Sequence, residues 1–271
     1  MSLSTIRRVT AGVASALSLA TLITVTACSS TTTGSSLAAL QERAKSCPED
    51  TSLNTFDGFD GTGSAQDEAL LITRWEAVRE HLTKAAVCAG HARVVVLSSS
   101  SATSTVLFDG DLHPTGATPN ARLRRVEDLV NTALTTAQSA YGLILPTLDA
   151  DGTDMTAAYY ALVDYIAERD DLGGDQVFGA RVETDGVQNV GVDLSIPSLN
   201  VQMAEALASA IEMPQLDDRV SVTFLGIGKV AGTDQPPTEY VNALKAFWSA
   251  TCHATGAKSC TVLTDFTGGS Q

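Results

Sequence analysis

The feature that most constrains this chain is a regular alternation of strand-like runs with amphipathic helical segments. Strands are predicted at Leu53–Phe59, Val94–Leu97, Thr105–Phe108, Val177–Thr184, Val220–Ile227 and Cys260–Thr264. Helices are predicted over Leu37–Ala44, Ala121–Leu145 and Thr156–Arg169, and around Trp75, Met203 and Trp248. Because helices separate most of the strands, crossover connections are expected, and these predict an α/β fold with a doubly wound, mainly parallel sheet flanked by helices.

Helix boundaries are predicted from residues that cap helices. Ser64, with Asp67 three positions later, is typical of a capping box and predicts the start of the helix around Trp75. Ser198 is the expected cap of the helix around Met203, and Thr238 that of the helix around Trp248. The long apolar pattern after Asn120 predicts one uninterrupted helix.

Composition narrows the range of partners. The chain has 271 residues, 44% of them hydrophobic, which is enough to bury a substantial core. Its formal net charge is −14, so it lacks the basic surface that nucleic-acid binding requires. No nucleic-acid partner is therefore expected.

The N-terminus predicts export. Residues 1–27 contain Arg7, Arg8 and no acidic residue, and the apolar stretch Val9–Thr26 follows the two bases. A membrane-spanning anchor is one alternative, but Ser and Thr interrupt the stretch and its length is marginal for a span. An ordinary secreted protein is another.

The end of that stretch, Val25-Thr26-Ala27-Cys28, resembles a bacterial lipobox. The resemblance implies cleavage before Cys28 and attachment of lipid to its thiol, which would hold the protein outside the cytoplasm on the bacterial cell membrane. Loss of residues 1–27 would change the formal charge from −14 to −16, so the lipid is the only membrane contact expected. The predicted organisation is a signal peptide (1–27), a lipidated cysteine with a flexible tether (28–44) and one domain (45–271).

Four further cysteines are expected to form disulfides, because exported proteins reside where such bonds persist. Four cysteines allow three connectivities. We favour Cys47–Cys88 with Cys252–Cys260, because each pair flanks one region of the chain.

Three loops at predicted strand ends or helix starts carry oxygen-bearing side chains. They hold Asp60-x-Thr62-x-Ser64, Gly152-Thr153 and Thr184-Asp185-Gly186. In this order the loops resemble the metal-ion-dependent adhesion site of von Willebrand factor A domains. The resemblance covers about 220 residues and implies that family's sheet, including one antiparallel edge strand after the second strand. A competing alignment takes Val94–Leu97 as the first strand and leaves the metal site without its first Asp.

The resemblance implies a cation site. Its expected ligands are Asp60, Thr62, Ser64, Thr153 and Asp185, with the hydroxyls binding directly and the carboxylates directly or through water. Such oxygen donors suit Mg²⁺ or another hard divalent cation such as Mn²⁺. A cation held largely by neutral hydroxyls can accept a carboxylate from a partner protein. The expected function is thus a membrane-anchored binding or adhesion module, not an enzyme.

Two alternatives remain open. In the first, the chain is a cell-envelope enzyme or assembly factor whose activity depends on a residue such as Ser100 or His91. In the other it is a structural lipoprotein with a vestigial metal site. No G-x-S-x-G, H-E-x-x-H or P-loop pattern supports an enzyme. The acidic loop Asp149–Asp154 is interpreted as a solvated turn, with a second cation or a tuning charge as the alternative. The bases Arg122, Arg124 and Arg125 are interpreted as surface charge or a rim contact.

Overall fold

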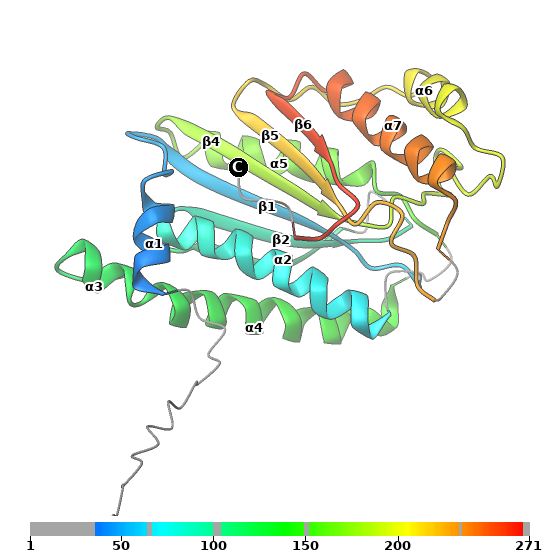
Figure 1. Cartoon of the computed structure of the whole chain (residues 1–271). Coiled ribbons are helices and arrows are strands. Elements are labelled where there is room, and N and C mark those ends of the chain that lie inside the picture. Colours follow the sequence, from blue (N-terminus) through cyan, green and yellow to red (C-terminus); the bar gives the residue numbers. More distant parts are fainter. Residues whose placement is uncertain (1–35, 64–66, 100–103, 149–151, 233–234, 268–271) are drawn as a thin grey trace, which may run out of the picture. The chain divides into compact units, whose positions relative to one another are not determined.

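Six strands form one sheet at the centre of the fold in a computed structural model that describes residues 36–63, 67–99, 104–148, 152–232 and 235–267 (Figure 1). The strands are β1 (Ser52–Asp60), β2 (His91–Leu97), β3 (Thr105–Asp111), β4 (Gln176–Glu183), β5 (Val220–Leu225) and β6 (Ser259–Val262). The helices are α1 (Leu37–Ala44), α2 (Glu68–Val87), α3 (Pro119–Leu123), α4 (Val126–Ile144), the short 3₁₀ helix η3 (Leu145–Thr147), α5 (Ala157–Asp170), α6 (Val201–Ser209) and α7 (Thr238–Ala254). The described residues, from Ser36 onward, form one compact unit.

The order of strands in the sheet is β3-β2-β1-β4-β5-β6. Five strands are parallel, and β3 pairs antiparallel with β2 at one edge. The predicted α/β fold with a mainly parallel sheet and one antiparallel edge strand is confirmed. Because β1 lies in the centre, paired with both β2 and β4, the competing alignment that began the fold at Val94 is wrong.

Alternating side chains of β2 pack into the two larger hydrophobic cores, one on each face of the sheet. Val95 and Leu97 of β2 point into the core beneath α5, α6 and α7, whereas Val94 and Val96 point into the core beneath α1, α2 and α4. Every residue of β2 is buried, as expected for a strand covered on both faces. Figure 1 shows α2 and α4 on one side of the sheet and α5 and α7 on the other.

Both predicted disulfides are present, Cys47–Cys88 and Cys252–Cys260. The first joins the segment after α1 to the end of α2, and the second joins α7 to β6. Helix α1 coincides with the short helix expected at Leu37–Ala44, but Leu40 is buried in the core beneath α2 and α4, so this helix is part of the folded unit and not of the tether. The folded unit therefore begins before the predicted domain boundary at residue 45.

Several predicted helix limits are wrong. The first turn of α2 is capped by Asp67, whose carboxylate accepts hydrogen bonds from the N–H groups of Ala69 and Leu70, so the helix starts after the expected Ser64. Ser64 itself lies outside the described residues. Helix α6 is capped by Asn200, not Ser198, because an Asn side chain nearer the helix accepts from the Met203 N–H.

The long helix expected from Ala121 to Leu145 is two helices, α3 and α4. At their junction the Arg125 N–H bonds to the Arg122 carbonyl, three residues back, and this tighter turn interrupts the α-helical pattern. The helix α7 begins at Thr238, so the expected cap is its first helical residue. Within the described residues, no helix combines the length and apolar character needed to cross a bilayer.

The Cys47–Cys88 bond closes the longer of the two loops, with a sequence separation of 41. Chain-entropy arguments predict that the double substitution Cys47→Ala with Cys88→Ala lowers the free energy of unfolding by about 4 kcal/mol. Both cysteines are only half-buried, so their truncation leaves little cavity to confuse the measurement. Urea unfolding followed by circular dichroism provides the test. A loss below about 1 kcal/mol would contradict the entropic account.

Candidate metal centre

The carboxyl ends of β1 and β4 lie side by side at the topological switch point of the sheet. From β1 the chain passes to β2 on one side, and it returns on the other side as β4. In open α/β sheets, ligands bind in the crevice outside the carboxyl ends of such a strand pair. The pairing of Phe59 with Glu183 places the next residues, Asp60 and Thr184, across from each other.

Asp60 is the last residue of β1, and its side chain is fully buried. Its Oδ1 accepts hydrogen bonds from the backbone N–H of Thr62 at 3.0 Å and from the Thr62 hydroxyl at 2.7 Å. Its Oδ2 accepts from the hydroxyl of Thr184 at 2.8 Å. The carboxylate therefore joins the two strand ends and fixes the orientation of both hydroxyls.

Gly61 makes this turn possible. Its N–H donates to the Leu97 carbonyl at 2.8 Å, which continues the β1–β2 pairing one residue past the strand. A Cβ at this position would lie 2.6 Å from both Leu148 and Val96. A larger residue here would push the Asp60–Thr62 segment away from β2.

The Thr184-Asp185-Gly186 turn is held from three directions. Asp185 Oδ1 accepts from the Val187 N–H at 2.8 Å, and the Asp185 carbonyl accepts from the Gly228 N–H at 2.7 Å. Gly186 has φ of +81°, a conformation that favours glycine, and its carbonyl accepts from the Trp248 indole N–H at 3.0 Å. Helix α7 and the loop after β5 thus set the position of Asp185.

Thr153 is joined to the same region by a neighbouring loop. Its N–H donates to the Asn189 side-chain oxygen at 2.8 Å, and its carbonyl accepts from the N–H groups of Asn189 and Val190. The next residue, Asp154, donates its N–H to the Ser98 carbonyl at the end of β2. Thr153 is therefore tied to the segment that follows Asp185.

Of the five predicted ligands, the structure describes four. Asp60 and Thr62 are in direct contact, Asp185 follows the Thr184 that bonds to Asp60, and Thr153 is tied to the loop after Asp185. The fifth, Ser64, lies outside the described residues, as do Asp149 and Asp151.

A buried arginine, Arg74 of α2, lies directly beneath the two strand ends. Its guanidinium donates to the carbonyl oxygens of Asp60 at 2.7 Å and Glu183 at 2.5 Å, and it lies 4.1 Å from the centre of the Phe59 ring. Burial lowers the pKa of Arg74, and the nearby carboxylates of Asp60 and Glu183 oppose that shift. The group provides a permanent positive charge beside the candidate ligands.

Deeper under α2 lies a pair of buried acids on β1 and β4, Asp57 and Glu183. Burial raises the pKa of Asp57 to about 8, and it raises the pKa of Glu183 well above its usual value, with Asp57 adding to that rise. His81 contacts Asp57 Oδ1 at 2.9 Å, and burial lowers the pKa of His81 well below its usual value. Burial therefore favours the uncharged forms of all three side chains, while the positive charge of Arg181 opposes the rise for the two acids.

The described donors suit a hard cation. A hydroxyl that donates its hydrogen to a carboxylate keeps its lone pairs for another ligand, and Thr62 donates to Asp60 in this way. Carboxylate and hydroxyl oxygens are the donors that Mg²⁺ prefers. In the part of the chain that the structure describes, no three His, Cys, Asp or Glu side chains gather as metal ligands. A cation here would consequently depend on threonine hydroxyls together with two carboxylates.

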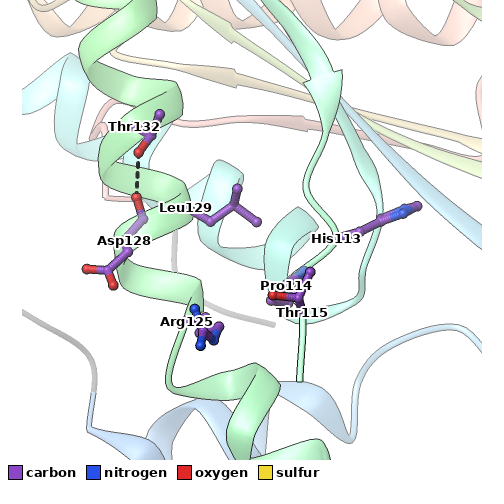
Figure 2. A pocket seen from close by; sticks show the side chains of 7 residues that line it. All are labelled: His113, Pro114, Thr115, Arg125, Asp128, Leu129 and Thr132. Carbon is purple, nitrogen blue, oxygen red and sulfur yellow. Dashed lines mark hydrogen bonds between the residues drawn. The ribbon is translucent and has the colours of Figure 1, made fainter. Parts of the chain in front are cut away.

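A surface pocket of about 280 Å³ lies near the amino end of β2, at the other end of the strands from Asp60 (Figure 2). The pairing of Asp111 with His91 places the residues after β3 at the amino end of β2, far from Asp60. Leu129 extends from α4 toward the loop that carries Pro114 and Thr115 (Figure 2). This pocket contains none of the predicted metal ligands.

The same geometry separates the residues named for an enzyme. His91 begins β2, where its ring contacts the Tyr165 hydroxyl at 2.8 Å and Asp109 at 3.2 Å. Ser98 follows the other end of this strand, about 20 Å away at the usual rise per residue. Ser100 lies outside the described residues.

Sequence reasoning missed three residues that build this centre. Arg74 occupies a core-facing position between Leu71 and Val78 of α2, and a charge on an apolar face was the available signal. Thr184 adjoins Asp185 in a recognised turn, and the strand register identifies it. Asn189 had no sequence signal, because its contact with Thr153 spans 36 residues.

Comparisons with known proteins give distant structural similarity. No protein-family model matches the chain, and no curated protein matches it. The conserved hypothetical protein BatB from Bacteroides thetaiotaomicron has a TM-score of 0.39 at 15% identity, over 79% of this chain and 90% of that one.

Proximal thread matrix protein 1 from the mussel byssus has a TM-score of 0.41 at 16% identity, over 80% of this chain and 45% of its own. The pilus adhesin SpaC from Lactobacillus rhamnosus GG, in an open conformation, has a TM-score of 0.42 at 11% identity. The match covers 79% of this chain and 28% of the adhesin. These similarities are too distant to transfer any property of those proteins.

The buried Asp57 predicts a stability that falls as pH rises. Its folded-state pKa of about 8 lies above the model-peptide value of 3.8, so its contribution is complete below about pH 4 and is lost through pH 8. Between these two pKa values, each carboxyl that keeps its proton in the folded state lowers the free energy of unfolding by about 1.4 kcal/mol for each unit of rising pH. We expect the free energy of unfolding to fall between about pH 7.5 and 8.5, because His81 is then neutral in both the folded and the unfolded chain and contributes no slope.

Asp57→Asn keeps the oxygen that faces His81 but cannot titrate. In this variant the free energy of unfolding should therefore fall less steeply with pH, by the contribution of one carboxyl. Urea unfolding at several pH values measures both slopes. Asp171→Asn, on an exposed residue, serves as the control with an unchanged slope. Equal slopes for the parent and Asp57→Asn would contradict the assignment.

Proposed function

We propose that this protein is an extracytoplasmic lipoprotein whose von Willebrand factor A-like domain binds a partner protein through a divalent cation. The observation that carries the proposal is the arrangement at the switch point. The Asp60 carboxylate accepts hydrogen bonds from Thr62 and Thr184, and Asp185 follows on the same strand end. These residues form one oxygen-rich cluster at the place where this class of sheet binds ligands.

In the proposed site, Thr62, Thr153 and Ser64 provide hydroxyl ligands, and Asp60 and Asp185 provide carboxylates directly or through water. The bound cation, Mg²⁺ or Mn²⁺, would supply an electrophilic position for a carboxylate of the partner. The chain's own groups orient these ligands. Asp60 aligns the Thr62 hydroxyl, and Arg74 holds the backbone carbonyls of both strand ends.

The membrane attachment in this proposal comes from Val25-Thr26-Ala27-Cys28, where Cys28 carries the lipid. Acyl chains contribute about 0.8 kcal/mol for each buried CH₂ group, so two or three chains are sufficient for stable anchoring. The acidic domain itself would be repelled by anionic headgroups.

The cation is tested by calorimetry of the full chain in detergent with Mg²⁺. Asp185→Ala is expected to abolish measurable binding, because it removes one of two carboxylates. Thr62→Val keeps side-chain volume and is expected to weaken binding by at least roughly tenfold, the loss typical even of residues outside the ligand shell.

Glu205→Ala is the matched control, since Glu205 is exposed on α6 and its removal also deletes one negative charge. It should bind Mg²⁺ as the parent does. Circular dichroism verifies that each variant is folded. Equal affinity for the parent, Asp185→Ala and Thr62→Val would refute the proposed cation site.

The anchor is tested in bacterial cells that express the full chain. Cys28→Ser is expected to abolish incorporation of labelled palmitate and to release the protein from the membrane fraction. Cys47→Ser removes a different cysteine and should leave labelling unchanged. Palmitate labelling that survives Cys28→Ser would show that the lipid lies elsewhere.

A further inference from the structure

Two short segments, residues 153–156 and 187–190, lie side by side although more than thirty residues separate them. They are joined by backbone and side-chain hydrogen bonds from Gln188, Asn189 and Val190. Neither segment belongs to a strand. These bonds are therefore direct contacts between the two loops, in addition to the positions that α5 and β4 give them.

Asn189 accounts for both backbone polar groups of Thr153. Its Oδ1 accepts from the Thr153 N–H at 2.8 Å, and its N–H donates to the Thr153 carbonyl at 3.1 Å. The Val190 N–H donates to the same carbonyl at 3.1 Å. Thr153 is 7% exposed, so loss of the Asn189 oxygen would leave a largely buried N–H without its acceptor.

Gln188 fixes the following residues. It is fully buried, and its Oε1 accepts from the N–H groups of Met155 at 2.9 Å and Thr156 at 3.1 Å. These donors immediately precede α5, which receives no hydrogen bond from its own N-cap side chain. The loop after β4 thus caps a helix that is remote in sequence, and it holds the start of that helix in place.

The other end of the second segment is bonded to Asp185, whose Oδ1 accepts from the Val187 N–H. A continuous series of contacts consequently runs from Asp185 through Val187, Gln188 and Asn189 to Thr153. Thr153 and Asp185 are both proposed cation ligands, and this series of contacts joins their loops directly.

We infer that Asn189, supported by Gln188, is a positioning residue that holds Thr153 at ligand distance from the cation bound near Asp185. This inference rests on the proposed function. When Asn189 holds the loop, the Thr153 hydroxyl occupies one ligand position. When the tie is lost, Thr153 moves away and a water molecule takes its place on the cation.

The test uses the full chain in detergent with Mn²⁺ as the probe. Binding is measured by calorimetry, and the number of coordinated waters is measured by magnetic resonance in ¹⁷O-labelled water. Asn189→Ala is expected to weaken Mn²⁺ binding by roughly 10–100-fold, as is typical when an outer-shell partner is removed. It is also expected to add one water to the bound ion.

Asn189→Asp keeps the acceptor oxygen for the Thr153 N–H and should keep the parent's number of waters. Asn131→Ala is the matched control, because Asn131 on α4 also accepts a hydrogen bond, from Arg79 of α2, and neither residue is a proposed ligand. It should change neither affinity nor water number.

The outcomes are distinct. If the parent binds Mn²⁺ and Asn189→Ala binds it equally well with the same number of waters, the inference is overturned and the proposed function stands. An extra water in Asn131→Ala as well would also overturn it, because the effect would then be one of general destabilisation. If the parent binds no Mn²⁺, the proposed function fails and the inference fails with it.

Discussion

The parallel pairing of β1 with β4 is the interaction on which the rest of the structure depends. These central strands are consecutive in space but are separated in sequence by two other strands, so their carboxyl ends meet where the chain reverses its direction of winding. The register places Asp60 across from Thr184, and the hydrogen bond between their side chains fixes that register at its last pair. Each element of the candidate centre is attached to this pair. Arg74 approaches from α2, Trp248 from α7, and the Asn189 segment continues from β4 itself.

The buried polar residues of β1 show the cost of this arrangement. Asn54, Thr55, Asp57 and Asp60 are all fully buried on a central strand, where apolar side chains are usual. Each Asn54 side-chain atom has a partner, Gln176 for its nitrogen and Arg169 for its oxygen. Asp57 avoids the cost of a buried charge by keeping its proton to about pH 8. At the carboxyl end of the strand, Arg74 donates a hydrogen bond to the backbone carbonyl of Asp60. Buried polar side chains make such a strand less stable than an apolar one, but they hold polar groups in fixed positions at its carboxyl end.

The sequence was sufficient to predict the fold because the relevant signals are local. Apolar runs such as Val94–Leu97 and the helical spacing around Trp75 identify the elements, and their alternation predicts a parallel sheet. The disulfides followed from the position of each cysteine pair. The break between α3 and α4 was not predictable, because the Arg125–Arg122 turn leaves the apolar pattern intact. Arg74 and Asn189 were missed for a related reason. Their roles come from contacts across 14 to 109 positions, which no local pattern contains.

Charge explains why such a centre suits an acidic protein. Without a cation, the carboxylates of Asp60 and Asp185 outnumber the single guanidinium of Arg74, and the domain as a whole is acidic. An acidic partner would then be repelled. Under the proposed function, a divalent cation adds two positive charges at the strand ends, so the local charge changes sign while the remaining surface stays negative. Attraction to a partner carboxylate is then confined to one point, because the surrounding acidic surface opposes every other approach. Arg74 contributes to the same balance, since a fixed positive charge beneath the ligands reduces the number of charges that the cation must offset.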